Sequence, residues 1–155
     1  MKDDLQELQL TCFRIGDDLF AVDIMRIKEI IRPQKLTNIP KAPPFVEGVI
    51  NLRGMVIPVI DLRRRFDLPV QGELQMSRLL IVSVARHVIG LVVDEVTEVI
   101  TVAVGDIKPP PDVMVGVGSK HLIGVCLVKD NLIMLLNLDT IISKAEVAAL
   151  GTLSN

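Results

Sequence analysis

The stretch GVINLRGMVIPVIDLRRRF, residues 48–66, decides how this chain folds. Two apolar runs rich in β-branched side chains, 49–50 and 55–57, flank the tetrapeptide NLRG, whose composition is typical of a turn. The stretch therefore predicts a β-hairpin. Pro58 has no backbone N–H to donate, so we expect its strand at a sheet edge or at a bulge. Asp61 precedes LRRRF, and a carboxylate at that position is a favourable N-cap for a short helix.

The segment before this hairpin is predicted to be β-structure that ends in a proline-rich connector. Residues 8–15 alternate between polar and apolar side chains, and a Gly-Asp-Asp turn separates them from the apolar run 19–22. The isoleucines of residues 24–31 have a spacing that also suits one face of a helix. Their β-branched side chains favour two short strands with a bend near Met25. The prolines of residues 40–44 exclude a helix interior or a central strand there.

The second half of the chain repeats the first. Residues 19–31 align without a gap on residues 88–100, and every isoleucine of the first segment falls on a β-branched residue of the second. Residues 48–66 align in the same way on residues 124–142, where Asn137 takes the capping position before a second expected short helix. Two copies of one set of elements predict two similar small β units. Short strands avoid exposed edges by curling into small barrels, whose apolar faces then pack together.

Composition narrows the class of protein. Half of the 155 residues are hydrophobic and the mean hydropathy is +0.48, but no apolar run approaches the ~20 residues that span a bilayer. We therefore expect no direct membrane insertion. The acidic N-terminal sequence MKDDLQELQL lacks the apolar centre of a signal peptide, which predicts a cytoplasmic protein. A net charge of −2 and an aromatic content of 3% argue against nucleic-acid binding. The apolar excess fits buried cores and patches that contact other proteins.

The sequence contains no recognisable catalytic or metal-binding motif. His87 and His121 are far apart, and neither has a Cys or Asp at metal-ligand spacing. Phosphate-binding loops, dinucleotide fingerprints and nucleophile elbows are absent from the sequence. Asp94 stands where a turn is expected, and a solvated position explains it more simply than acid-base chemistry. Cys12 and Cys126 lie in apolar runs and are expected to be small buried residues outside any disulfide framework. These observations predict a protein that is not an enzyme and has no cofactor or metal.

Together the motifs resemble those of the CheW-like chemotaxis coupling proteins. The signature is GVINLRG followed by VIPVIDLR, and further matches are FRIGD from Phe13, the spacing of Ile27 and Ile30, and GLVVD at residues 90–94. The resemblance extends from about Leu8 to Ile142. It implies an all-β fold with short helices, in which two small five-stranded SH3-like β-barrel subdomains pack on a shared core.

The resemblance also implies the domain limits and the function. We expect one CheW-like domain over residues 8–142, with barrels at 8–70 and 76–142 that could exchange strands, and a C-terminal helix or tail over 143–155. The expected protein is a stand-alone adaptor, without catalysis, that couples chemoreceptors (methyl-accepting chemotaxis proteins) to the histidine kinase CheA. It would bind the regulatory domain of CheA and the cytoplasmic receptor tip, and would reach membrane receptor arrays through these partners. The alternatives are a CheW-like scaffold of a non-flagellar chemosensory pathway and a small-ligand-binding β-barrel.

Five residues match the family's pattern as candidate receptor contacts: Ile27, Glu29, Gly48, Arg53 and Val99. Ile27 and Val99 would be apolar contacts, although ordinary core positions explain them equally well. Glu29 and Arg53 would be the polar members, paired with each other and holding the hairpin in place. A purely structural ion pair is the alternative for Arg53. The kinase-binding surface is expected on the second barrel without assigned residues, and the sequence leaves open whether the two faces are swapped.

Overall fold

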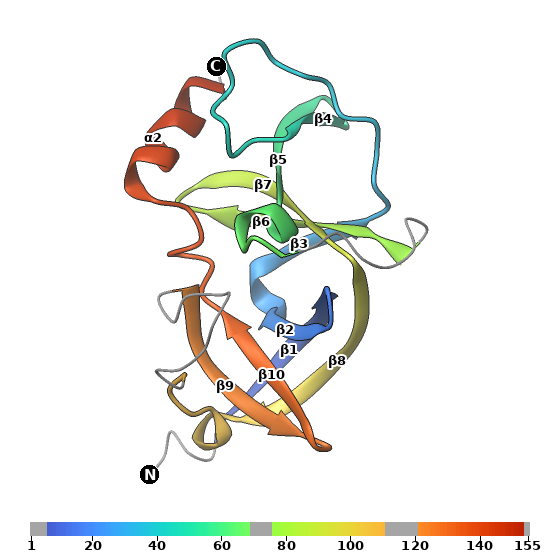
Figure 1. The fold of residues 1–155 in the computed structure, drawn as a ribbon, viewed down its shortest axis with the longest axis vertical. Coiled ribbons are helices and arrows are strands. Elements are labelled where there is room, and N and C mark those ends of the chain that lie inside the picture. Colours follow the sequence, from blue (N-terminus) through green and yellow to red (C-terminus); the bar gives the residue numbers. More distant parts are fainter. Residues whose placement is uncertain (1–5, 69–75, 111–120, 154–155) are drawn as a thin grey trace.

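The computed structural model describes residues 6–68, 76–110 and 121–153. These residues form ten strands in two five-stranded sheets, with two α-helices and short 3-10 turns (Figure 1). The strands are β1 (Glu7–Ile15), β2 (Asp18–Asp23), β3 (Ile27–Ile31), β4 (Gly48–Leu52), β5 (Met55–Asp61), β6 (Arg78–Val84), β7 (His87–Val93), β8 (Glu95–Ala103), β9 (Leu122–Val128) and β10 (Asn131–Leu136). The helices are α1 (Leu62–Arg65) and α2 (Lys144–Leu153), and the 3-10 turns are η2 (Ile24–Arg26) and η4 (Val104–Asp106).

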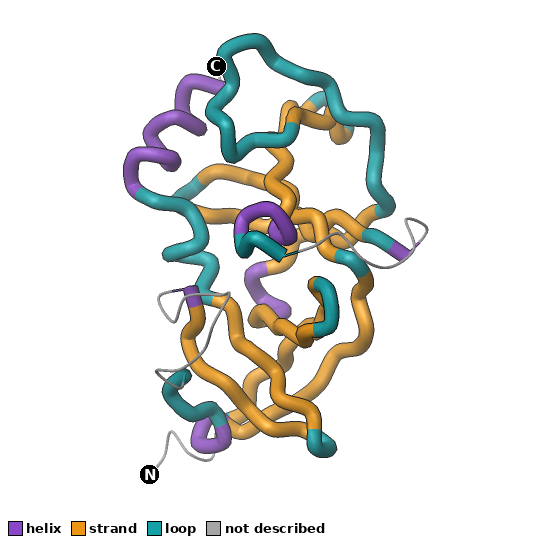
Figure 2. Tube along the Cα trace, in the orientation of Figure 1, coloured by secondary structure: helices purple, strands orange, loops and turns teal. Residues whose placement is uncertain are grey.

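The two sheets exchange strands between the halves of the chain. One sheet, here called the β1 sheet, has the order β8-β1-β2-β10-β9, and the other, the β6 sheet, has the order β3-β6-β7-β5-β4. Each sheet joins the halves through one parallel pair, β2 with β10 or β7 with β5, and one antiparallel pair, β1 with β8 or β3 with β6. Each sheet therefore contains strands from both expected halves, 8–70 and 76–142. The β1 sheet lies in the lower part of Figure 2 and the β6 sheet in the upper part.

The internal repeat predicted from the sequence is confirmed by the topology. β1 to β5 correspond in order to β6 to β10, and the two sheet orders become identical when each strand is replaced by its counterpart. The hairpin turns also match. Arg53 and Gly54 have φ values of 52° and 85°, and Lys129 and Asp130 have 49° and 67°. Two successive left-handed residues are the geometry of the type I′ turn, which suits the twist of paired strands.

The first strands follow the predicted pattern. β1 and β2 form an antiparallel hairpin, and η2 makes the expected bend near Met25 before β3 begins. Asp23 caps this bend, because its side chain accepts a hydrogen bond from the backbone N–H of Met25 at 2.9 Å. The proline-rich segment 32–47 contains no strand. It bonds to the β6 sheet through a bridge between Thr37 and Val49 and through the Glu47 N–H, which donates to the Val59 carbonyl oxygen at 2.8 Å.

The prediction that Pro58 marks an edge strand or a bulge is wrong. β5 lies between β4 and β7, and Pro58 stands in regular register opposite Val49. The N–H and C=O groups of Val49 both bond outward to Thr37 at 2.9 Å, so Val49 and Pro58 exchange no hydrogen bond. Pairing with β7 begins only at Val59. An interior strand therefore tolerates this proline because no bond to β4 is lost.

One of the two predicted short helices forms. Asp61 caps α1 by accepting a hydrogen bond from the N–H of Arg63 at 2.9 Å. Asn137 accepts the corresponding bond from the N–H of Asp139 at 3.0 Å, but the residues that follow form turns. Ile141 and Ile142 are buried in the central core, and packing of these β-branched side chains is favoured there over a helical turn.

The largest apolar cluster lies between the sheets. Phe20 stacks on Phe13 and on Phe66 there, with ring centroids 6.1 and 5.5 Å apart. Each sheet also has a smaller apolar cluster of its own. Cys12 and Cys126 lie in the cluster of the β1 sheet, where both are buried and form no disulfide. A central core and one core per sheet make the two β subdomains a single packed unit.

The segment after residue 142 forms α2. The Ser143 Oγ accepts from the N–H of Glu146 at 3.2 Å, and Glu146 accepts from the N–H of Ser143 at 2.9 Å, which is a capping box. The side chain of Leu150 packs in the central core and so anchors the helix there. Residues 154–155 of the expected tail lie outside the described part. No helix among the described residues is both long and apolar enough to cross a membrane.

Candidate functional site

The side chains of Glu29 and Arg53 form an ion pair that joins opposite edges of the β6 sheet. Glu29 lies on β3, one edge strand, and Arg53 lies in the turn after β4, the other edge strand. The Arg53 Nη1 and Nη2 atoms donate to the two carboxylate oxygens of Glu29 at 3.2 and 2.5 Å. This two-point contact fixes the orientation of the guanidinium and closes the gap between the strand ends.

The ion pair is accessible to a partner. The side chain of Arg53 is 70% exposed and that of Glu29 is 34% exposed. The hydrogen bond from Arg53 lowers the pKa of Glu29, and the bond to Glu29 raises the pKa of Arg53. Both groups are therefore charged at neutral pH, and an exposed pair of this kind contributes little to folding. Its charge and fixed geometry suit recognition better than stabilisation.

Apolar side chains surround the pair. A shallow cavity of about 240 Å³ lies beside it, with Leu52, Met55 and Val88 among the residues that line it. Met55 and Val56 are exposed at the start of β5, next to the turn that carries Arg53. An apolar surface with a charged rim is typical of protein interfaces, so the hairpin tip is a candidate docking surface.

Gly48 belongs to the interior rather than to this surface. A Cβ atom on Gly48 would lie 3.0 Å from the Thr37 carbonyl oxygen and 3.1 Å from the Leu36 Cβ. The missing side chain therefore lets the connector approach β4 closely enough for the Thr37–Val49 bridge. Gly48 therefore positions the base of the hairpin, away from the turn that carries Arg53.

The two apolar candidates differ in exposure. Ile27, on β3, is half-buried and packs against the central core. Val99, on β8, is exposed but belongs to the β1 sheet, where it lies opposite Thr11. Ile30 is exposed on β3 and is the position that the repeat aligns with Val99. Sequence reasoning passed over Ile30, although the alignment of the two halves pointed to it.

A second apolar surface lies on the β1 sheet. Leu127 on β9 and Leu132 on β10 form a cross-strand pair near the hairpin tip, and both are exposed. Ile123 on β9 is exposed as well. Paired exposed leucines at the end of a hairpin are unusual in a surface that only meets water. We call Leu127 and Leu132 the leucine surface, whereas Ile123 lies at the other end of β9.

The interpretation of Asp94 as a solvated turn residue is wrong. Asp94 is buried between β7 and β8, where one carboxylate oxygen accepts from Arg63 Nη1 at 3.0 Å and the other accepts from the Gly16 N–H at 2.6 Å. Arg63 also donates to both carboxylate oxygens of Asp61, at 2.9 and 2.8 Å. The hydrogen bond to Asp61 is the main cause of the raised pKa of Arg63. No pattern in the sequence indicated this buried network.

The described residues contain no cluster of His, Cys, Asp and Glu side chains that could hold a metal ion. His87 lies at the start of β7, and His121 packs its ring 6.0 Å from that of Phe66. The features that the structure does bring together are two exposed apolar surfaces, one on each sheet, and an ion pair beside one of them.

Comparison with known proteins identifies the relatives of this chain. The family model of the CheW-like domain matches residues 9–146. The chemotaxis protein CheW of Treponema pallidum is 33% identical over 152 residues, which cover 96% of this chain and 89% of that protein. CheW of Rhizobium meliloti is 35% identical over 138 residues and 89% of each chain. The crystal structure of the scaffolding protein TtCheW from Thermoanaerobacter tengcongensis matches with a TM-score of 0.83 at 34% identity, covering 89% of both chains.

Proposed function

This chain belongs to the CheW-like domain family, and on that premise we propose which of its surfaces meet which partners. The chain is a chemotaxis adaptor, and the role of its family is to couple chemoreceptors to the histidine kinase CheA. The proposed binding regions are the cytoplasmic tip of the receptors and the regulatory domain of CheA. In this proposal the protein catalyses no reaction and works in the cytoplasm, held at membrane receptor arrays by its partners.

The Glu29–Arg53 pair and the apolar residues beside it form the proposed receptor surface. The observation that carries this assignment is the exposed, two-point ion pair that links the two edges of one sheet. A charged pair held in fixed geometry beside Met55 and Val56 offers specificity and buried apolar area together. In this proposal Ile30 replaces Ile27 as the apolar contact of β3, and Gly48 has a positioning role.

The leucine surface is the proposed kinase surface. It lies on the β1 sheet, on strands that come from the second half of the chain. Its exposed apolar area is separated from the Glu29–Arg53 pair by the central core, so the two partners do not compete for one site. An adaptor needs this separation because it must hold both partners at once.

Titration calorimetry with the isolated regulatory domain of CheA and with a receptor-tip fragment, both from the same cell, tests the assignment. We expect 1:1 binding of the wild-type chain to each partner. Arg53→Ala should weaken receptor binding at least ten-fold and leave kinase binding unchanged, whereas Leu127→Ser should do the reverse. Arg64→Ala is the matched control, because it removes an equally exposed arginine from an ion pair with Glu47 at 2.7 Å.

The outcomes separate the parts of the proposal. If Arg53→Ala weakens kinase binding instead of receptor binding, the two faces are swapped. If Arg64→Ala acts as strongly as Arg53→Ala, the loss is a general effect of charge. If the folded wild-type chain binds neither cognate partner, the coupling role itself is contradicted for this chain.

A further inference from the structure

The chain crosses between the two sheets at two corners that the internal repeat makes equivalent. At one corner β2 of the β1 sheet leads through η2 into β3 of the β6 sheet, and at the other β7 of the β6 sheet leads through Asp94 into β8 of the β1 sheet (Figure 1). The alignment of residues 19–31 on 88–100 places Met25 on Asp94 and Arg26 on Glu95. The two corners can therefore be compared contact by contact.

The corner at Asp94 is buried and fully bonded. Its carboxylate accepts from Arg63, which follows β5 of the β6 sheet, and from the Gly16 N–H in the β1–β2 turn of the β1 sheet. The Asp94 N–H donates to the Arg14 carbonyl oxygen at 3.0 Å. The side chains of Arg63 and Asp94 are only 10% and 4% exposed. This corner, which we call the buried corner, fixes one sheet to the other.

The corner at Arg26 joins corresponding segments through a residue one position further along the chain, and the charges are reversed. Arg26 Nη2 donates to Asp139, which follows β10 of the β1 sheet, at 2.9 Å, and to the Ser83 carbonyl oxygen of β6 at 3.3 Å. The repeat aligns Asp139 with Arg63. Ser83 lies opposite Val88 and Arg14 lies opposite Leu19, and the repeat aligns Leu19 on Val88. Ser83 and Arg14 therefore occupy equivalent positions.

The corner at Arg26 is much more accessible, and we call it the open corner. The side chains of Arg26 and Asp139 are 36% and 71% exposed, and one nitrogen of Arg26 makes both contacts. An exposed single-point ion pair is easily replaced by water, whereas the network around Arg63 is not. One side of the joint between the sheets is thus held firmly and the other weakly.

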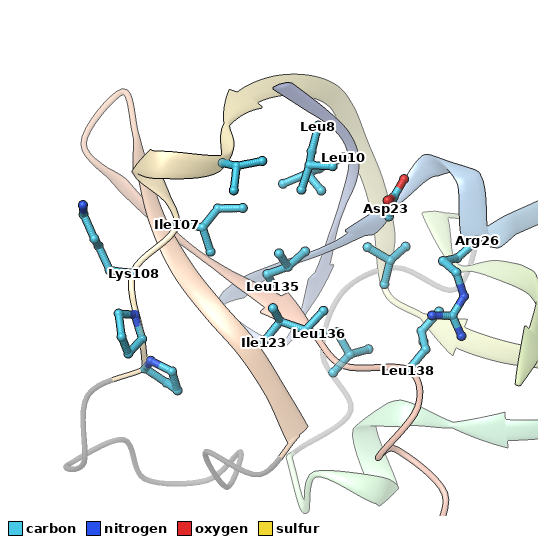
Figure 3. Close-up of a pocket in the computed structure, with 14 residues that line it drawn as sticks. Leu8, Leu10, Asp23, Arg26, Ile107, Lys108, Ile123, Leu135, Leu136 and Leu138 are labelled. Atoms are coloured by element: carbon cyan, nitrogen blue, oxygen red, sulfur yellow. The ribbon is translucent and has the colours of Figure 1, made fainter. Parts of the chain in front are cut away.

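There is also more space beside the open corner. The cavity there measures about 510 Å³, and Asp23, Arg26 and Leu138 lie together at one end of it (Figure 3). The equivalent cavity beside the buried corner is lined by Asp61 and Arg63 and measures about 260 Å³. Each cavity is lined by one sheet and the segments that flank it, so the larger cavity gives the Arg26 side chain free space in which to turn away from Asp139.

The open corner connects the two proposed binding surfaces. Arg26 immediately precedes β3, which carries Glu29 of the proposed receptor surface. Asp139 follows β10, which carries Leu132 of the leucine surface. The Arg26–Asp139 contact is therefore a short structural link between the strand that would meet the receptor and the strand that would meet the kinase.

We propose that the two sheets turn about the buried corner, and that opening and closing of the Arg26–Asp139 contact couples the receptor surface to the kinase surface. This inference rests on the proposed function, because it assigns a regulatory movement to the two surfaces named there. A partner that binds one state of the contact more tightly shifts the equilibrium toward that state. The shift changes the affinity of the other surface for its own partner, by an amount that the difference in affinity sets.

The coupling is tested by titrating the regulatory domain of CheA into the chain, alone and with a saturating receptor-tip fragment. For the wild-type chain we expect the tip to change kinase affinity by up to about five-fold, which is as much as an exposed ion pair of this kind can supply. Arg26→Ala should reduce this factor to one, and each partner alone should then bind with the affinity of the open state, which differs from the wild-type affinity by no more than the same factor. The charge-swapped variant, Arg26→Asp with Asp139→Arg, should restore the coupling, and Arg64→Ala should leave it unchanged.

A measurement without partners tests the movement itself. Spin labels placed at exposed Arg86 of the β6 sheet and Lys129 of the β1 sheet, with Cys12 and Cys126 replaced by alanine, report the distance between the sheets. Arg26→Ala should broaden the distance distribution, and Arg64→Ala should not. Unchanged distances in Arg26→Ala, or a wild-type coupling factor of one, would overturn the inference. Absence of binding to either partner alone would instead contradict the proposed function, and the distance measurement would still decide the movement.

Discussion

Replacing Asp94 by alanine should destabilise the protein far more than replacing Asp139, although both carboxylates accept from an arginine at a corner between the sheets. Asp94 is buried, and its loss leaves the Gly16 N–H without its acceptor and Arg63 without one of its two carboxylates. Asp139 is largely exposed, and water replaces its single contact with Arg26.

The magnitudes follow from burial. Breaking a buried ion pair by removing one partner costs about 3–5 kcal/mol. Arg63 keeps Asp61 as a partner, so we expect a value near the lower end of this range for Asp94→Ala. Removing an exposed partner costs roughly 0–1 kcal/mol, which is the expectation for Asp139→Ala. For a chain of this length each kcal/mol lowers the melting temperature by roughly 2–4 °C, so the two variants should be clearly separated.

Urea unfolding followed by far-UV circular dichroism measures the difference, because the chain has no Trp or Tyr to serve as a fluorescence probe. The two variants should share the wild-type slope and differ in midpoint. If Asp94→Ala fails to fold, Asp94→Asn, which keeps an acceptor oxygen for the Gly16 N–H, should give an intermediate loss. Equal losses for Asp94→Ala and Asp139→Ala would refute the distinction between a buried and an open corner.

Three further predictions use other parts of the molecule. Gly124→Ala should cost about 1–3 kcal/mol of stability and Gly48→Ala less, because the new Cβ would lie 2.6 Å from a backbone oxygen in the first case and 3.0 Å in the second; equal urea midpoints would contradict this. Burial alone raises the pKa of Glu146, but the hydrogen bonds that it accepts from an arginine and a serine lower the pKa by more, so the net shift is downward from 4.5. Its contribution to stability is therefore complete above about pH 4.5 and disappears as the pH falls through the lowered pKa, and Glu146→Gln should flatten this acid dependence in thermal unfolding. Burial, with smaller effects of nearby acidic groups, raises the pKa of Cys12 to about 11 and also that of Cys126, so neither thiol should react with a thiol reagent at pH 8 until the chain is unfolded in urea.

The sequence predicted local elements and the repeat well because both depend on neighbours in the chain. The hairpin at Arg53, the bend near Met25 and the cap at Asp61 are all present, since turn chemistry and capping act over a few residues. The exchange of strands depends on pairing between distant segments, which no local pattern records. The interior position of Pro58 and the absence of a helix after Asn137 depend on the same kind of distant packing.

The candidate site was predicted unevenly for a similar reason. The Glu29–Arg53 pair forms as expected, because the family pattern includes both residues. Gly48 allows a close backbone approach and Ile27 packs partly against the central core, which the sequence could not show because it does not record which face of a strand is covered. Asp94 was misinterpreted because a buried acid and a turn acid look alike until the partner of the acid, here Arg63, is known.

The internal repeat gives a reason to assign the two surfaces to different partners. A protein with two identical halves would present the same surface twice. Two different partners can therefore be told apart only through positions at which the halves differ. Glu29 and Arg53 correspond to Glu98 and Lys129, and the latter two form no ion pair in the described part of the chain.

The hairpin tips differ in the opposite sense. The cross-strand pair of Leu127 and Leu132 corresponds to Asn51 and Val56, so one tip is apolar where the other carries an amide and the ion pair. In the proposed assignment, electrostatic complementarity selects the receptor at one surface and apolar burial selects the kinase at the other. Two unlike surfaces on one shared core, linked by a weak contact at Arg26, are what the proposed adaptor needs in order to distinguish its partners and respond to one of them.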